Sequence, residues 1–444
     1  MVKRQISMKM SNYSKELLKF AGPVIAGQLG LMLIGAGDII IATKHSTTAL
    51  AAIGLAVAFA NPVLIVGFAF QFAISPIVAK YRGEGKNTDQ LAFASLIYAA
   101  LLSIPFMILT ALAAELVPLL GYEPEMTGHV MSYVRISIGS IPGAFLYSAL
   151  REWLQAHERT FLANFVSIVA VPLNLLFNWM FVFGEWGIPA LGIDGLAWAS
   201  LTVRWFMGIA LLIPVLPYLR NVPRVDWGFI KEVVTLGWPT AIAMFFEVMA
   251  FCSCTLFIGK FGEIQTAAHN LVLTIASVAF MVPMAIASAV GVKVGHAYGE
   301  QNAQNLKGYA WMGLKMSVGF MGLSALCAFF FPQAMISVFG ASPEVNQLTI
   351  NLIFWMAIFQ IFDGAQVTLG AILRGINISR PVSIIIFIGY WIIGIPAGWW
   401  MANTLEMKAQ GFWIGLATSL ALVATGLFIL TYQKISKFSV QRHH

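Results

Sequence analysis

The sequence predicts an all-α integral membrane protein with twelve transmembrane helices in two parallel-related six-helix lobes. Three observations lead to this prediction. Only 10% of the 444 residues are charged and 59% are hydrophobic, twelve long apolar stretches follow one another, and the second half of the chain repeats the spacing of the first. A water-soluble domain carries roughly 25% charged residues because its surface must be solvated. Most of the surface of this chain must therefore face lipid.

Each apolar stretch is long enough for one crossing, which takes about 20 apolar residues. The stretches must be helical, because lipid offers no partner to a free backbone N–H or C=O. The predicted crossings lie near residues 17–43, 48–78, 91–118, 130–150, 161–183, 195–217, 233–259, 266–291, 308–331, 348–371, 382–403 and 410–432. Little of the chain is left for a soluble catalytic domain.

An internal repeat relates the two halves of the chain. Residues 15–23 align with residues 231–239 at an offset of 216, and Gly83-Glu84 then meets Gly299-Glu300 without a gap. Six helices in each half return the chain to its starting side, so the two halves have the same orientation. Parallel repeats of this kind belong to transporters, with the substrate path between the repeats.

The repeat and the basic residues predict the domains and the orientation. The predicted parts are an N-lobe at 1–217, a cytoplasmic linker at 218–232 and a C-lobe at 233–444. With the N-terminus inside, only Lys44, Lys260 and Lys408 of the loop basic residues fall outside. Basic loops stay in the cytoplasm, so this multi-pass protein is expected to have both termini there, in a bacterial-type inner (plasma) membrane. The net charge of +7 then reflects topology, and no nucleic-acid partner is expected.

Three acidic residues lie inside apolar stretches: Asp38, Glu247 and Asp363. A charge at the centre of the bilayer costs about 2.5–3.5 kcal/mol on insertion scales, so such residues usually face a cavity and function there. The structural alternative is a permanent pair with a buried arginine, for which Arg135 is a candidate. A carboxylate away from water favours one positive partner, whether a proton, Na⁺ or a cationic substrate. Competition between such partners is the exchange step of an antiporter.

Polar residues accompany Asp38 in the first half. Asn174 and Asn178 are four residues apart and share one helical face. They are expected to complete a hydrogen-bonded cluster, and the alternative is that they hold two helices together. Ser200 and Thr202 are weaker candidates, because hydroxyl groups can bond the backbone of their own helix.

The sequence lacks motifs for nucleotide or zinc chemistry. There is no phosphate-binding loop, since Gly83–Asn87 has neither the spacing nor the hydroxyl of one, and there is no H-E-x-x-H. We therefore expect a protein that is not an enzyme and that uses no cofactor besides a coupling ion.

The motifs resemble the multidrug and toxic compound extrusion (MATE) transporters, in particular their NorM-like branch. The resemblance covers nearly the whole chain. Its most specific stretch is 266–299, TAAHNLVLTIASVAFMVPMAIASAVGVKVGHAYG, and three further stretches are similar: 23–38, 246–248 and 362–375. The chain departs from the common pattern at four positions, which are Leu31, Ile39, Ser200 and Phe359.

The resemblance implies two six-helix lobes around a V-shaped central cavity and drug export driven by a Na⁺ or H⁺ gradient. It places Asp38, Asn174 and Asn178, with Ser200 beside them, on an N-lobe cation- or proton-coupling site. It places Glu247 and Asp363 on a C-lobe site for a cation or substrate. Na⁺ is expected at Glu247, Asp363 or Asp38, and the choice between Na⁺ and H⁺ stays open.

The expected function is multidrug efflux by alternating access, exporting lipophilic, mainly cationic organic compounds. The expected partners are amphiphilic small molecules and the lipid bilayer, and the protein is expected to be a monomer. One alternative is a lipid-linked oligosaccharide flippase of the same superfamily. That function usually needs many intramembrane basic residues, and the candidates are Arg135, Arg204 and Lys315. A membrane-embedded enzyme is a second alternative, but it would need clustered histidines or carboxylates near one membrane face.

Overall fold

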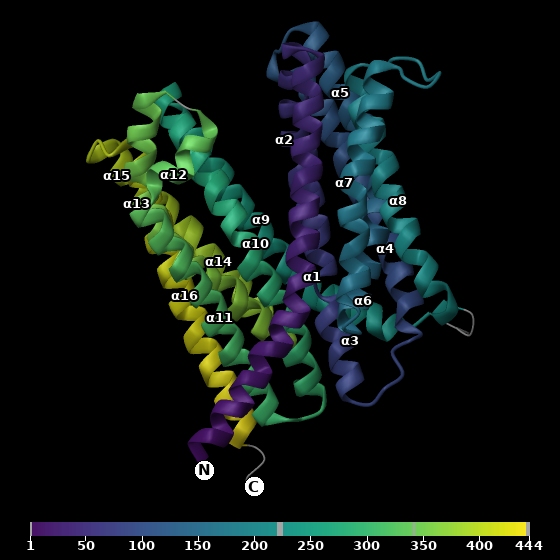
Figure 1. Ribbon diagram of the computed structural model, residues 1–444, viewed down its shortest axis with the longest axis vertical. Coiled ribbons are helices and arrows are strands. Elements are labelled where there is room, and N and C mark those ends of the chain that lie inside the picture. Colours follow the sequence, from purple (N-terminus) through teal and green to yellow (C-terminus); the bar gives the residue numbers. More distant parts are fainter. Residues whose placement is uncertain (1, 220–224, 341, 441–444) are drawn as a thin grey trace. The chain divides into compact units, whose positions relative to one another are not determined.

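The predicted all-α membrane fold is confirmed by the computed structural model, which describes residues 2–219, 225–340 and 342–440. Figure 1 labels the helices. Their bounds are Val2–His45 (α1), Thr47–Gln71 (α2), Ile74–Gly83 (α3), Leu91–Leu116 (α4), Pro124–Ile138 (α5), Ile141–Ala156 (α6), Thr160–Phe183 (α7), Ile193–Leu219 (α8), Trp227–Gly259 (α9), Glu263–Gly299 (α10), Ala303–Phe330 (α11), Pro332–Ile336 (α12), Pro343–Gly375 (α13), Arg380–Phe387 (α14), Ile395–Thr404 (α15) and Lys408–Val440 (α16). Short 3₁₀ segments cover Val117–Leu120 and Ser337–Phe339, and a π-helical segment (η3) covers Ile388–Gly394.

Eleven helical runs within the described residues are long and apolar enough to cross a membrane. The crossing expected near 130–150 is divided between α5 and α6, which have 15 and 16 residues. Pro142 explains the break, because it has no N–H for the carbonyl of Ile138 and its ring disturbs the preceding turn. The carbonyl of Gly139 at the break instead accepts a 2.9 Å hydrogen bond from the indole of Trp205 on α8.

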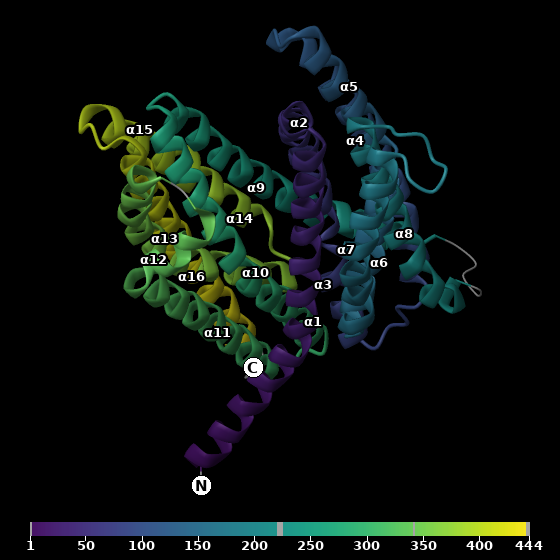
Figure 2. The same cartoon turned by 45° about the horizontal axis from the view of Figure 1, so that its top comes forward.

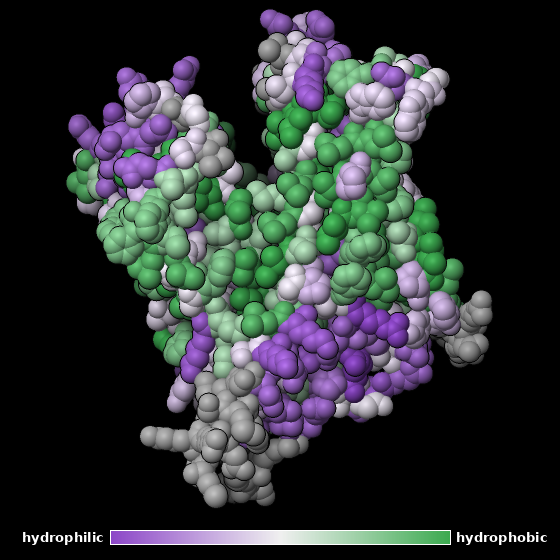
Figure 3. All heavy atoms as spheres, viewed as in Figure 1, coloured by the Kyte–Doolittle hydropathy of each residue, from purple (hydrophilic) through white to green (hydrophobic). Residues whose placement is uncertain are grey.

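The outer faces of the helices are apolar. On α4, Leu101, Ile104, Ile108 and Leu112 recur at helical spacing and are between 47% and 58% exposed. Figure 3 shows hydrophobic residues along the helices on the face drawn, with hydrophilic residues gathered at helix ends. Such a stripe would be costly in water but suits lipid, so these side chains cover the hydrocarbon-facing surface of a membrane protein.

The chain forms two compact units. The N-unit contains residues 23–78 and 86–241, and the C-unit contains residues 1–22, 79–85 and 242–444. α1 contributes to both, since Pro23 lies inside the helix and does not end it. Figure 2 shows α1 as one long helix. Part of the predicted linker, residues 220–224, lies outside the described residues, and α9 has already begun at Trp227. The lobe boundaries drawn from the sequence stay a prediction.

The Gly-Glu pairs of the internal repeat meet each other inside the C-unit. A side chain at Gly83 would collide with the carbonyl oxygen of His296 and the amide nitrogen of Glu300. A side chain at Gly299 would collide in the same way with the carbonyl oxygen of Lys80 and with the amide nitrogen of Glu84. The ends of α3 and α10 therefore cross backbone to backbone, with reciprocal contacts. Glycine recurs at this point of both halves because no Cβ fits there.

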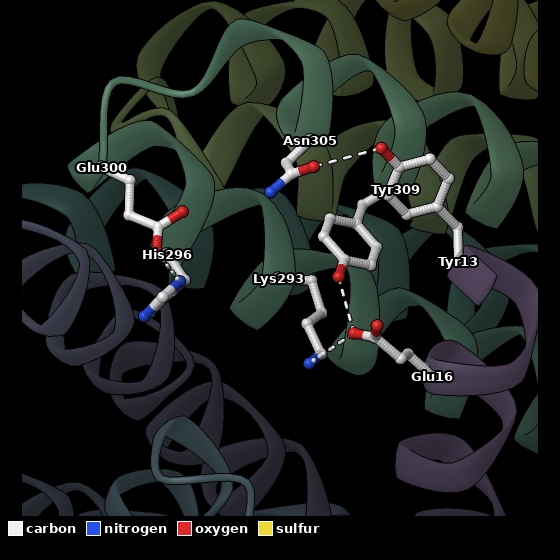
Figure 4. A network of polar contacts seen from close by, with 7 residues as sticks. All are labelled: Tyr13, Glu16, Lys293, His296, Glu300, Asn305 and Tyr309. Atoms are coloured by element: carbon white, nitrogen blue, oxygen red, sulfur yellow. Dashed lines mark hydrogen bonds and ion pairs between the residues drawn. The ribbon is translucent and has the colours of Figure 1, made fainter. Parts of the chain in front are cut away.

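A polar network joins the N-terminal part of α1 to α10 and α11 within the C-unit (Figure 4). The carboxylate of Glu16 accepts a 2.6 Å hydrogen bond from the Tyr309 hydroxyl and forms a 3.0 Å ion pair with Lys293. The Tyr13 hydroxyl donates to Asn305 at 3.1 Å, and its ring packs edge-on against Tyr309. These contacts explain why residues before Pro23 belong to the C-unit although the rest of α1 belongs to the N-unit.

Candidate cation-binding sites in two helical units

Asp38 is the centre of a buried hydrogen-bonded cluster in the N-unit. Its Oδ1 accepts hydrogen bonds from Nδ2 of Asn178 at 2.6 Å and from Nδ2 of Asn174 at 3.1 Å. Its Oδ2 accepts one from Oγ of Ser200 at 3.2 Å. All four side chains are buried, which makes each of these bonds more valuable than it would be in water. The structure thus brings together the four residues named for the N-lobe site, and their part in ion coupling stays a prediction.

Close approach of α1 to α7 makes this cluster geometrically possible. α1 presents glycines where α7 crosses it: a side chain at Gly27 would collide with Asn164, and one at Gly30 would lie 3.1 Å from the Ser167 carbonyl. At Gly37, directly before Asp38, a Cβ would lie 3.2 Å from Oδ1 of Asn174. Small residues let membrane helices pack closely. The glycines of α1 therefore set the short distances between Asp38 and the asparagines.

The basic residue near Asp38 is Arg204, and the candidate Arg135 was wrong. Arg135 lies at an exposed position and donates to Glu115 at 2.7 Å. Arg204, one turn after Ser200 on α8, interacts electrostatically with Asp38, as does Tyr133 of α5. Among the described side chains, no basic nitrogen comes within 4.0 Å of the Asp38 carboxylate, so the two charges are neighbours without forming a salt bridge.

Glu247 and Asp363 belong to one cluster in the C-unit. Nε2 of Gln366 on α13 donates to Oε1 of Glu247 on α9 at 3.2 Å. Asp363 is buried one turn before Gln366 and interacts electrostatically with Glu247. Within the described part of the chain, no hydrogen-bond donor reaches the Asp363 carboxylate. Two acids that share a site with so few donors are poorly satisfied without a proton or a cation.

The π-helical segment η3 places Tyr390 beside these acids. Tyr390 is fully buried and interacts electrostatically with both Glu247 and Asp363. The N–H of Ile395 bonds the Tyr390 carbonyl five residues earlier, which is the π-helical pattern. Pro396 follows immediately and has no N–H for the usual α-helical bond to Ile392. π-helical turns of this kind occur frequently at functional sites.

Aromatic side chains enclose the C-unit cluster. Phe251 packs edge-on against Phe359, one turn before Asp363, and also contacts Tyr390. Phe359 in turn packs against Trp413 of α16. Asp363 is buried beside this apolar shell, which increases the cost of an unpaired charge there. Phe359, one of the departures from the common family pattern, therefore completes an apolar wall.

Both clusters contain buried oxygen atoms without a hydrogen-bond partner. These atoms are Oδ1 of Asn178 in the N-unit, and Oε1 of Gln366 and the Tyr390 hydroxyl in the C-unit. Carboxylate, amide and hydroxyl oxygens are the ligands that hard cations prefer. No group of three or more His, Cys, Asp or Glu side chains gathers among the described residues. Amide and phenol oxygens would therefore have to complete any cation site around these carboxylates.

The contributors that were not named as site residues from the sequence include Arg204, Gln366 and Tyr390. Arg204 had a visible signal, because a basic residue in an apolar stretch is rare. Gln366 lies on the same helical face as Asp363, three residues away, which was also visible. Tyr390 had no such signal, because its position depends on the π-helical turn.

Comparison with known proteins identifies the family. The MatE family model matches residues 23–180 and 239–400. The multidrug resistance protein NorM of Aliivibrio fischeri is 30% identical over 442 residues, covering 95% of this chain and 96% of its own. The probable multidrug resistance protein NorM of Mesorhizobium japonicum is 31% identical over 424 residues, covering 92% of this chain and 91% of its own.

Solved structures share the fold. The crystal structure of MATE in the bent conformation superposes with a TM-score of 0.89 at 16% identity and covers 99% of both chains. The eukaryotic MATE transporter AtDTX14 superposes with a TM-score of 0.86 at 16% identity, covering 98% of this chain and 99% of its own. The family-model match, the similarity to the NorM proteins over nearly their full length and the shared fold agree with the resemblance seen in the motifs. The chain belongs to the MatE family of transporters.

Proposed function

We propose that this protein is a multidrug efflux antiporter, which exports lipophilic, mainly cationic organic compounds across a bacterial inner membrane in exchange for Na⁺ or H⁺. The family and the names of its NorM relatives support the transport of drugs. The observation that carries the exchange step is the pair of buried clusters around Asp38 and around Glu247 with Asp363. Neither cluster contains a salt bridge to a basic residue within 4.0 Å among the described residues.

The physical basis of exchange is the cost of an uncompensated charge away from water. Each carboxylate favours one positive partner at a time, so the binding of one partner favours the release of another. A coupling cation drives transport only if it binds one conformation more tightly than the other, because differential affinity is the only way a ligand shifts such an equilibrium. We propose that cation binding at these carboxylates favours the conformation that releases drug outside.

The flippase alternative is less well supported by the described side chains. Lys315 is exposed on α11, and Arg135 bonds Glu115 at an exposed position. Of the three candidate bases from the sequence, Arg204 is therefore the one at a cluster, where it bonds Ser140. Anionic headgroup recognition would need several converging basic side chains.

Reconstitution into vesicles tests the function. Vesicles containing the purified protein receive a fluorescent cationic dye, and Na⁺ and proton gradients are imposed separately. Dye movement against its own gradient under at least one of the two ion gradients is the expected result. Dye movement that follows only its own concentration gradient would contradict antiport, and protein-free vesicles are the control.

A further inference from the structure

Arg204 is a charged side chain near Asp38 that has no role in the exchange mechanism proposed above. Its Nη1 donates a 2.6 Å hydrogen bond to Oγ of Ser140, at the break between α5 and α6. The Ser140 hydroxyl donates in turn to the Ser137 carbonyl at 2.6 Å. The Ser140 hydroxyl therefore acts both as a donor, to the Ser137 carbonyl, and as an acceptor, from the Arg204 guanidinium.

The helix that carries Arg204 is fixed at the same break. The indole of the next residue, Trp205, donates to the Gly139 carbonyl at 2.9 Å. A side chain at Gly143 would lie 2.9 Å from the Trp205 amide nitrogen, so α6 and α8 are in close backbone contact. The backbone beside Arg204 is thus held against the α5–α6 break.

The guanidinium and the Asp38 carboxylate share a neighbourhood without touching. Ser200 and Arg204 are four residues apart on α8, so they share one face of that helix. Ser200 bonds Oδ2 of Asp38 at 3.2 Å, and Tyr133 interacts electrostatically with both charged groups. Because the arginine side chain has many rotamers, its head group can change partner without a movement of the backbone.

We propose that Arg204 is a built-in counter-charge for Asp38, which neutralises the carboxylate when no external cation is bound and with which every entering cation must compete. The inference rests on the proposed function, because it takes Asp38 to be a cation site. Arginine keeps its charge at any physiological pH. Arg204 therefore lowers the affinity of Asp38 for monovalent cations and favours their release, and the tether at Ser140 sets how strongly it does so.

Two substitutions should shift cation affinity in opposite directions. Arg204→Gln removes the competing charge and should raise the Asp38-dependent affinity on the order of tenfold, while slower release lowers both KM and the maximal rate of dye transport. Arg204→Lys keeps a positive charge and should stay near wild type. Ser140→Ala removes the tether, so the guanidinium moves toward Asp38 and the affinity should fall.

The experiment is a binding titration of the purified full-length protein with two separate probes, ethidium and Na⁺. Ethidium binding is followed by its fluorescence and Na⁺ binding by tryptophan fluorescence. The Asp38-dependent part is the difference between wild type and Asp38→Asn. Arg135→Gln is the matched control, because it removes an arginine of the same unit that bonds Glu115 and not Ser140. Thermal unfolding shows that each variant is folded.

The expected result is tighter binding in Arg204→Gln, weaker binding in Ser140→Ala and no change in Arg135→Gln. If Arg204→Gln leaves the Asp38-dependent affinity unchanged, the proposed counter-charge role of Arg204 is wrong, while Asp38 can still be a cation site. If Arg204→Gln does not fold, unchanged affinity in Ser140→Ala would overturn it. Failure to find any Asp38-dependent binding of either probe would overturn both this inference and the N-unit cation site, so the two failures are distinguishable.

Discussion

Asn178 and Asp38 are 140 residues apart in the chain, yet Nδ2 of Asn178 donates a 2.6 Å hydrogen bond to Oδ1 of Asp38. The amide supplies part of the solvation that the carboxylate loses in the membrane. It supplies no charge, so the ionised carboxylate keeps its attraction for a cation. Because the asparagine amide adds solvation but no charge, it leaves Asp38 able to bind and release positive partners.

Removal of the Asp38 charge should abolish coupling. In Asp38→Asn, gradient-driven efflux should fall by about tenfold or more, since each 1.4 kcal/mol of lost differential binding is a factor of ten. The protein should still fold, because asparagine has a similar shape. Asp89→Asn, which changes an exposed acid of the same unit, is the control. Wild-type efflux by reconstituted Asp38→Asn would exclude Asp38 as a coupling group.

Glu247 and Asp363 should behave as one unit. Glu247→Gln and Asp363→Asn should each remove most of the gradient-driven transport, and the double variant should be little worse than either, because groups that act together are not additive. Dye uptake into vesicles measures this, with the exposed Glu263→Gln as the control. Losses that multiply in the double variant would show two independent sites.

Loss of the Asn178 amide should affect stability as well as transport. Asn178→Ala leaves Asp38 without its shortest hydrogen bond, and an unsatisfied buried polar group costs about 1–3 kcal/mol. We expect a lower thermal unfolding midpoint in detergent together with weaker efflux. Asp38→Asn should reduce the destabilisation, because a neutral amide needs less solvation than a carboxylate. Equal destabilisation by Asn178→Ala in both backgrounds would contradict the contact with Asp38.

The reciprocal glycine crossing should tolerate no side chain. Gly83→Ala or Gly299→Ala places a methyl group against a backbone carbonyl and should cost about 1–3 kcal/mol of stability, as overpacking does. Gly319→Ala is the matched control, because a Cβ on this glycine of α11 meets nothing within 4 Å. Thermal unfolding of the three variants decides the matter, and an equal midpoint for all three would mean that the helix ends can separate without cost.

Much of the fold was predictable because lipid leaves a chain few options. Apolar stretches must be helices in lipid. Their number can be counted in the sequence, the repeat of their spacing predicts two similar halves, and the basic loops predict the orientation. The break between α5 and α6 was missed, although Gly139 and Pro142 were visible, because the apolar pattern continues across them. Which segments of the first half pack in the C-unit depends on contacts such as Glu16 with Tyr309, which no local pattern reveals.

A site residue could be predicted from the sequence where its side chain is costly to bury in a membrane and therefore rare there. Asp38, Glu247 and Asp363 were visible because charges are rare in apolar helices. The asparagines were visible through their spacing of four. Arg135 was the candidate partner of Asp38, but the structure pairs Arg135 with Glu115 and places Arg204 near Asp38, because helical rotation and the α5–α6 break decide which arginine faces the cluster. Tyr390 depends on a π-helical turn, a backbone feature that side-chain patterns do not encode.

Reversed coupling tests the exchange mechanism most directly. Vesicles containing the protein are prepared without any ion gradient, a cationic dye gradient is imposed, and Na⁺ and H⁺ movements are followed with separate indicators. If the carboxylates trade one positive partner for another, the dye gradient must drive one of the two ions in the opposite direction in wild type, and not in Asp38→Asn with Glu247→Gln. Dye flux without any opposing ion flux in wild type would contradict antiport.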